Sequence, residues 1–144
     1  MTYDEVLATY GDPTQTDFET KNIVPFDLPY PLVYGSAIIT RTRAHRLAVP
    51  HFVHALQEVK DSGLMEGLTH FSGIFAIRSI RAHPGHPSAH SWGCAGDFNA
   101  ETNQLGTLGH MDPRVVDIFK ANGFTWGGDF HARKDPMHFS LLGF

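Results

Sequence analysis

The stretch SAHSWGCAGD (residues 88–97) combines an imidazole at His90 with a carboxylate at Asp97 and glycines at Gly93 and Gly96. An odd separation of seven residues would put His90 and Asp97 on opposite faces of one uninterrupted strand. A turn at residues 91–93 followed by a strand through Asp97 brings both side chains to one point, and glycines permit such a reversal. The segment therefore predicts half of a metal site, although a buried structural histidine is the more common interpretation of His90 taken alone.

The other half of the predicted site is DPMHF (residues 135–139), which adds an imidazole at His138 and a carboxylate at Asp135. Pro136 breaks regular structure, so Asp135 approaches from a loop. Two imidazoles and one carboxylate, with a fourth position open, form a ligand set typical of catalytic zinc. The additional carboxylate can then carry protons. The alternative for this tail alone is a loop acid before a strand, with His138 half buried.

The composition limits the class of protein and its partners. With 144 residues, 42% of them hydrophobic and 18% charged, we expect one globular domain over residues 1–144. The net charge of −4 and the absence of a Lys/Arg run argue against a nucleic-acid partner. No apolar stretch approaches the ~20 residues of a membrane span. The N-terminal MTYDEVLATYGDP shows no export signal, so we expect synthesis in the cytoplasm.

The histidines and the single cysteine limit the metal chemistry. Cys94 is the only cysteine, which excludes an internal disulfide and a four-cysteine zinc cluster. Any transition metal must therefore be bound mainly by carboxylates and by some of the ten histidines. We interpret Cys94 itself as a small buried apolar residue.

Hydrophobic periodicity and cap signals predict a set of short elements. We expect helices over residues 3–11, from Pro50 to about residue 63, and over residues 111–123, where Asp112 is the N-cap and Pro113 the first helical residue. We expect strands over residues 36–40, 72–78, 94–99, 124–130 and 137–144, and irregular structure elsewhere in residues 12–46. Few elements alternate strictly between strand and helix. The pattern therefore favours an α+β fold with a small, mainly antiparallel sheet and helices packed on one face.

Two motifs carry a resemblance to a known family. The pattern S-x-H-x-x-G-x-A-x-D over residues 88–97 has a chance on the order of one in a million at one starting position. A second pattern, G-x-x-W-G-G-D-F, begins at Gly123 and is followed by D-x-x-H-F from Asp135. Together they resemble the zinc D-alanyl-D-alanine carboxypeptidases and L-alanyl-D-glutamate endopeptidases, a family that includes many phage endolysins. The resemblance covers about residues 74–144, the motif-bearing half of the chain.

The resemblance implies a role for six residues. It matches His90, Asp97 and His138 to the three zinc ligands of the family. Asp135 falls at the position of the catalytic acid/base, and Ser88 at a serine that helps to hold substrate. Arg78 matches an arginine that polarises the scissile carbonyl or binds substrate. The short loop between Arg78 and Ser88 departs from the family pattern, so Arg81 remains the alternative functional arginine.

The resemblance also implies a fold and an activity. The fold is the one that these peptidases share with hedgehog signalling domains. The implied function is zinc-dependent hydrolysis of peptidoglycan stem peptides by a monomeric enzyme, with the L-alanyl-D-glutamate endopeptidase type of phage endolysin favoured. Such a lysin reaches the cell wall only after release from the cell that made it. The alternatives are a D-alanyl-D-alanine carboxypeptidase and a non-catalytic, hedgehog-like zinc-binding module. Asp129 is expected either to support a ligand histidine or to be a plain turn residue.

Overall fold

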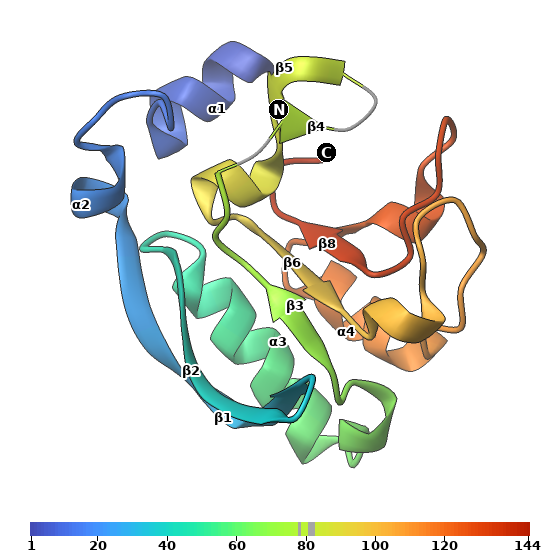
Figure 1. Ribbon diagram of the computed structural model, residues 1–144. Coiled ribbons are helices and arrows are strands. Elements are labelled where there is room, and N and C mark those ends of the chain that lie inside the picture. Colours follow the sequence, from blue (N-terminus) through green and yellow to red (C-terminus); the bar gives the residue numbers. More distant parts are fainter. Residues whose placement is uncertain (78, 81–82) are drawn as a thin grey trace.

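The structure is a computed structural model that describes residues 1–77, 79–80 and 83–144. It has four α-helices and eight short strands in this part of the chain, joined by loops and single 3-10 turns (Figure 1). In chain order the helices and strands are α1 (Tyr3–Tyr10), α2 (Phe18–Asn22), β1 (Ile23–Tyr34), β2 (Ala37–His45), α3 (Val49–Asp61), β3 (Phe71–Gly73), β4 (Ser79–Ile80), β5 (His83–Pro87), β6 (Ala95–Phe98), α4 (Pro113–Ala121), β7 (Thr125–Trp126) and β8 (His138–Ser140). The 3-10 turns are η1 (Met65–Gly67), η2 (Ala89–Trp92), η3 (Ala100–Thr102) and η4 (Gly127–Asp129).

A four-stranded sheet in the order β3-β6-β8-β7 forms the centre of the molecule, and all of its pairings are antiparallel. Alternation along the strands gives it two different faces. Phe98 and Phe139 lie on one face and contact the ring of Phe119 on α4, with ring centroids 5.6 and 4.4 Å apart. Asp97 and His138 occupy the intervening positions, so they lie on the opposite face. The α+β prediction with a small antiparallel sheet is confirmed.

Helices α3 and α4 supply most of the apolar cover for that first face (Figure 1). Helix α4 begins as predicted, with the Asp112 side chain accepting from the Arg114 N–H at 2.9 Å and Pro113 in the first turn. Its buried residues follow helical spacing: Val115, Val116, Ile118 and Phe119. Helix α3 likewise has a proline in its first turn and buries Phe52, Ala55, Leu56 and Val59. Burying these stripes is the main favourable term in assembling the sheet and helices.

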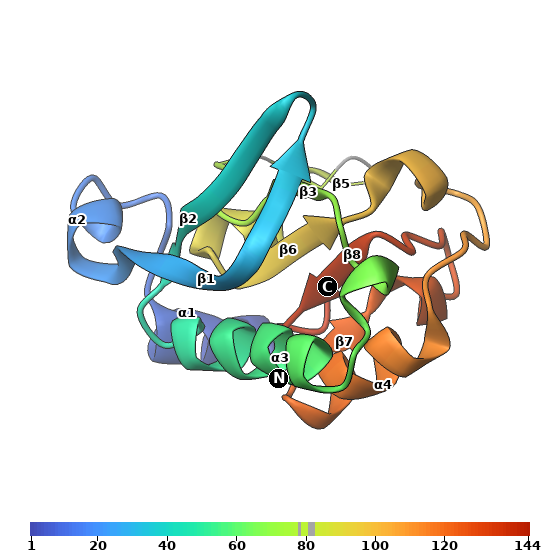
Figure 2. The same cartoon turned by 90° about the horizontal axis from the view of Figure 1, so that it is seen from below.

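The prediction of irregular structure over most of residues 12–46 is wrong. This segment contains α2 and a long antiparallel hairpin of β1 and β2, which curves alongside α3 (Figures 1 and 2). Buried residues alternate along β1 at Phe26, Leu28, Tyr30 and Leu32, but intervening prolines obscure the pattern in the sequence. Pro29 and Pro31 fall within the interval from Asp27 to Leu32 where the register shifts. Their missing N–H groups are therefore tolerated by the ladder.

The strand predicted over residues 72–78 is also mostly wrong. Strand β3 ends at Gly73, where φ is +113°, and residues 74–77 are not in a strand. The short strand β4 then pairs with β5 in a separate two-stranded sheet. The apolar run IFAI (residues 74–77) is not a strand of the central sheet. Its main chain contacts His90 instead, through the oxygen of Ile74 and the N–H of Ala76. No helix in the described ranges is long and apolar enough to cross a membrane.

His45, at the end of β2, is a fully buried histidine with both ring nitrogens engaged. Its Nδ1 accepts from the Leu47 N–H at 3.1 Å, so Nε2 carries the proton and donates to the Tyr10 main-chain oxygen at 2.8 Å. Burial lowers the pKa of His45 and the charge of Arg46 adds to this effect, while the hydrogen bond to Tyr10 opposes it. His45 therefore joins α1 to the hairpin in its neutral form.

This arrangement predicts a stability that depends on pH. Because the pKa of His45 is lower in the folded than in the unfolded chain, the stability it contributes is complete above the unfolded value of about 6.5 and is lost as pH falls below it. His45→Gln should cost about 1–3 kcal/mol at neutral pH and reduce this loss. Urea unfolding at about pH 7.5 and 5.5, with chelator present, measures both effects. Equal losses of stability in the two proteins on acidification would contradict the assignment.

Candidate metal centre

Strands β6 and β8 place a carboxylate and an imidazole next to each other. Asp97 and His138 are direct partners across the antiparallel ladder, so their side chains leave the sheet on the same face. The two residues are 41 positions apart in the sequence, and only strand pairing brings them together. His138 Nδ1 lies 3.2 Å from Asp97 Oδ1.

The 3-10 turn η2 brings His90 to the same point. The Ser88 side chain accepts from the His90 N–H at 3.3 Å and caps this turn. Gly93 ends it with φ +71°, in the left-handed region that suits glycine, and the chain then enters β6. The predicted reversal between His90 and Asp97 is confirmed, with η2 as its structural form.

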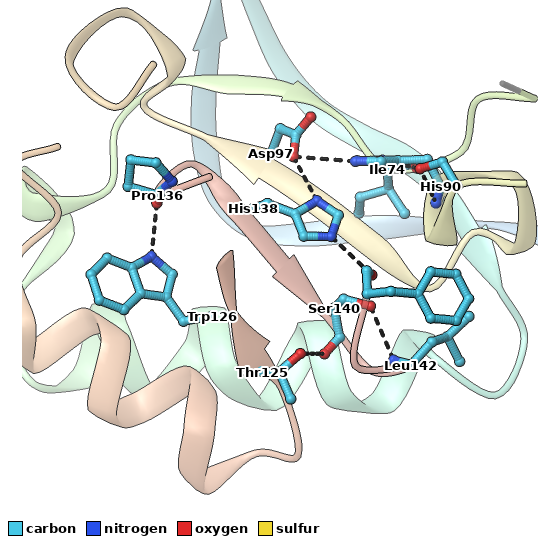
Figure 3. A network of polar contacts seen from close by, with 11 residues as sticks. Ile74, His90, Asp97, Thr125, Trp126, Pro136, His138, Ser140 and Leu142 are labelled. Carbon is cyan, nitrogen blue, oxygen red and sulfur yellow. Dashed lines mark hydrogen bonds and ion pairs between the residues drawn. The ribbon is translucent and has the colours of Figure 1, made fainter. Parts of the chain in front are cut away.

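The three side chains form a compact, buried cluster (Figure 3). Asp97 Oδ1 lies 3.2 Å from His90 Nε2 and 3.2 Å from His138 Nδ1, and the three potential ligand atoms all lie within 4.8 Å of one another. The centroids of the two imidazole rings are 5.1 Å apart. Relative exposures are 2% for His90, 7% for Asp97 and 5% for His138. The structure thus brings together the three residues predicted as ligands.

Hydrogen bonds on the far side of each imidazole decide which nitrogen faces Asp97. His90 Nδ1 lies 2.8 Å from the main-chain oxygen of Ile74, and His138 Nε2 lies 3.1 Å from that of Phe144. A main-chain oxygen only accepts, so these contacts favour a proton on His90 Nδ1 and on His138 Nε2. In histidines with that tautomer, the nitrogen turned toward Asp97 is unprotonated and can bind a cation.

This donor set fits a divalent cation. Two imidazole nitrogens and a carboxylate oxygen converge on one buried point, and all three can bind a cation in their deprotonated forms. Histidines that bind metals commonly donate their other ring N–H to a carbonyl or carboxylate, as both histidines do here. His90, Asp97 and His138 would hold the ion, and two imidazoles with one carboxylate suit zinc.

In the metal-free cluster, Asp97 and His138 shift the pKa of each other. Burial alone would raise the pKa of Asp97, but the hydrogen bonds and charges of His138 and His90 outweigh it and hold this pKa far below its usual range. Burial alone would lower the pKa of His138, but its contact with Asp97 outweighs that effect and raises it, aided by the negative charge of Asp135. Asp97 and His138 are therefore a tightly coupled pair at the centre of the cluster.

Asp135 lies beside this cluster without being one of its three members. Its main-chain N–H donates to Gly127 at 2.9 Å and its main-chain oxygen accepts from the His138 N–H at 3.0 Å. The loop therefore places Asp135 one turn before His138, and its Oδ1 atom is buried. The Trp126 indole donates to the main-chain oxygen of Pro136 at 2.8 Å and steadies the same loop (Figure 3).

The other sequence-selected residues have different surroundings. Ser88 is buried and caps η2, while Arg78 and Arg81 lie outside the described residues. The Asp129 carboxylate is exposed and forms an ion pair with Lys120 at 2.7 Å, so it is not the supporting partner of a ligand histidine. Burial raises the pKa of the Cys94 thiol, which agrees with its interpretation as a buried apolar residue.

Sequence reasoning missed the groups that support the two histidines. Ile74 and Phe144 act through main-chain oxygens, which carry no residue-specific signal. Gly96, one of the two glycines expected to permit the reversal, lies in β6 instead. Packing explains why it has no side chain, because an added Cβ would lie 2.8 Å from the Phe98 ring and 3.1 Å from the Phe52 ring.

Comparison with known proteins supports the resemblance at the level of the family. Residues 82–141, somewhat less than half of the chain, match the model of a family described as D-alanyl-D-alanine carboxypeptidase. The matched range contains His90, Asp97, Asp135 and His138. No curated protein matches the chain. The family match and the buried His-Asp-His group together indicate a peptidase-like hydrolase with a potential metal site.

The geometry at Gly93 predicts a large loss of stability on substitution. A Cβ added there would lie 2.6 Å from the His45 main-chain nitrogen and 2.8 Å from Ile23, in addition to the strain of a positive φ. Gly93→Ala should therefore cost about 2–4 kcal/mol of unfolding free energy. Gly106→Ala is the control, because φ there is +86° but the nearest atom lies 3.8 Å away, and it should cost only about 1 kcal/mol. Equal losses, measured by urea unfolding, would contradict the close packing at Gly93.

The cluster also predicts one tight site for zinc. Isothermal titration of chelator-treated protein with Zn²⁺ should show one bound ion, and His90→Ala or His138→Ala should weaken binding by more than about 100-fold. His110→Ala, which removes an exposed histidine outside the cluster, should change nothing. Undiminished stoichiometry and affinity in the His90/His138 double variant would exclude these ligands.

Proposed function

We propose that the protein is a zinc peptidase that hydrolyses peptide bonds in peptidoglycan stem peptides. The observation that carries this proposal is the convergence of His90, Asp97 and His138, contributed by η2, β6 and β8, on one buried point. Its second support is the family match over residues 82–141, because carboxypeptidases of that description act on D-alanyl peptides. The first support is geometric and the second is a similarity of sequence.

In the proposed mechanism, each group of the chain has a separate task. Zinc, when bound, supplies the Lewis acidity that polarises a carbonyl and acidifies water. Asp135 accepts the proton of the attacking water and passes it to the leaving amine nitrogen, as a general base and then a general acid. Its position beside His138, outside the group of three potential ligands, supports this role. The carbonyls of Ile74 and Phe144 hold the imidazoles in orientation.

Substrate contacts are assigned by resemblance. We propose Arg78, with Arg81 as the alternative, as the cation that stabilises the developing oxyanion. Ser88 is proposed to help hold substrate, and its capping bond to His90 places it directly beside the ligand turn.

Within this family, we propose the L-alanyl-D-glutamate endopeptidase type found in phage endolysins. The support is Asp135 itself, since aspartate at the acid/base position is frequent in the endolysin branch, whereas glutamate is usual in the carboxypeptidase branch. A D-alanyl-D-alanine carboxypeptidase is the alternative, and the description of the matching family favours it. An endolysin of this type would be made in the cytoplasm, act on the cell wall after release and work as a monomer.

A non-catalytic, hedgehog-like module is the candidate from another class. The low exposure of the three potential ligands favours it, because a purely structural metal site is closed to solvent. A structural site has no need of an additional carboxylate next to His138. Substitution of Asp135 therefore distinguishes a peptidase from a binding module.

Asp135→Asn should keep zinc affinity and lose at least about 100-fold in cleavage rate, because proton transfer is lost while the ligands stay intact. Asp129→Asn is the matched control, since it removes an exposed carboxylate paired with Lys120, and should leave the rate unchanged. The assay is digestion of purified peptidoglycan with mass spectrometry of the fragments. Loss of terminal D-alanine indicates a carboxypeptidase, and new D-glutamate amino termini indicate the endopeptidase. Zinc binding without any cleavage by the parent protein would favour the binding module.

A further inference from the structure

The residues after β8 fold back over the candidate metal centre. The Leu141 N–H donates to the Cys94 main-chain oxygen at 2.9 Å, and the Leu142 N–H donates to Ser140 Oγ at 3.0 Å. This turn brings the main-chain oxygen of Phe144 to 3.1 Å from His138 Nε2. The match to the family ends at residue 141, so Phe144 lies outside it.

An aromatic cluster holds the Phe144 ring. Its centroid lies 5.8 Å from Trp92 and 5.5 Å from His86, in edge-to-face geometry at 76° and 88°. Trp92 is fully buried and donates through its indole N–H to Gly11 at 2.8 Å. Tyr3 on α1 contacts both His86 and Trp92. The ring of Phe144 is thus anchored to η2, the element that carries His90.

Two acceptors compete for the single ring proton of a neutral His138. The carboxylate of Asp97, 3.2 Å from Nδ1, favours a proton on Nδ1, and this form cannot bind a cation between the two side chains. The oxygen of Phe144 favours the proton on Nε2, which leaves the Nδ1 lone pair directed at Asp97. Without Phe144, only the preference of Asp97 for a proton on Nδ1 remains.

We propose that Phe144 is a positioning residue of the metal centre: its ring, packed on Trp92 and His86, fixes its main-chain oxygen, which holds His138 in the tautomer that binds the metal. This proposal rests on the metal site of the proposed function. The residues after 141, which lie beyond the family match, would then prepare the metal-free site for binding the ion.

Zinc affinity tests the proposal, measured by competition with a chromogenic chelator. Deletion of Phe144 should weaken Zn²⁺ binding by about 10–100-fold, as for other outer partners of metal-binding histidines. Phe144→Ala, which keeps the main-chain oxygen but loses the ring, should weaken it less. Tyr34→Ala removes an aromatic ring that is 60% exposed on the distant hairpin and should bind zinc like the parent. Melting of the metal-free variants shows whether they remain folded.

Nitrogen NMR of the histidine side chains gives a direct readout of the tautomer. In metal-free parent protein, at a pH high enough for the His138 imidazole to be neutral, His138 should carry its proton on Nε2. In the deletion variant the proton should move to Nδ1, while His90 keeps its Nδ1 proton and serves as the internal reference.

The outcomes separate this proposal from the proposed function. A parent protein with His138 protonated on Nδ1 overturns the role of Phe144, and this measurement does not depend on whether any variant folds. A folded deletion variant with zinc affinity within about twofold of the parent also overturns it, while the metal site stands. A parent that binds no zinc contradicts the proposed function, and the tautomer of its His138 still decides the role assigned to Phe144.

Discussion

The antiparallel pairing of β6 with β8 is the constraint on which the candidate site depends. It sets Asp97 opposite His138 and, by alternation, turns Phe98 and Phe139 to the other face, where α4 covers them. A slip of one residue in this register would exchange the two sets of side chains, burying a carboxylate among aromatic rings. A single register of β6 and β8 therefore fixes both the hydrophobic face and the polar site.

The third side chain of the site depends on a different kind of element. His90 lies on a short 3-10 turn that the Ser88 hydroxyl caps and Gly93 ends. Such a turn has little stability of its own. Two contacts of His90 hold this turn: its main-chain oxygen accepts from the Ala76 N–H, and its imidazole contacts the Ile74 main-chain oxygen. Burial of the Trp92 side chain stabilises the turn further. The N-terminal part of the chain thereby supports the site, because the indole of Trp92 donates to Gly11 and the backbone of His45 packs on Gly93.

The site gathers a carboxylate and two imidazoles in a buried place. A carboxylate loses its hydration on burial, and the two histidines beside Asp97 offset this cost. The other ring nitrogen of each histidine faces a main-chain oxygen, that of Ile74 for His90 and that of Phe144, six residues further along the chain, for His138. The arrangement is suited to hold a cation, and its three residues lie within the range of the family match.

Much of this protein was readable from its sequence, and the failures share a cause. Helices α1, α3 and α4, strand β6 and the convergence of His90, Asp97 and His138 follow from caps, periodicity and spaced motifs, which are local signals. The hairpin of β1 and β2 was missed because Pro25, Pro29 and Pro31 argue locally against a strand. The register shift accommodates Pro29 and Pro31, whereas Pro25 lies in register opposite Arg43. The strand expected over residues 72–78 ended early at Gly73, where an apolar run alone could not reveal the break.

By itself, the sequence determined which chemical groups were available and the helix and strand patterns that carry them. The tertiary structure alone decided which nitrogen of each histidine faces Asp97, because that choice is made by main-chain oxygens that every residue possesses and only folding can position.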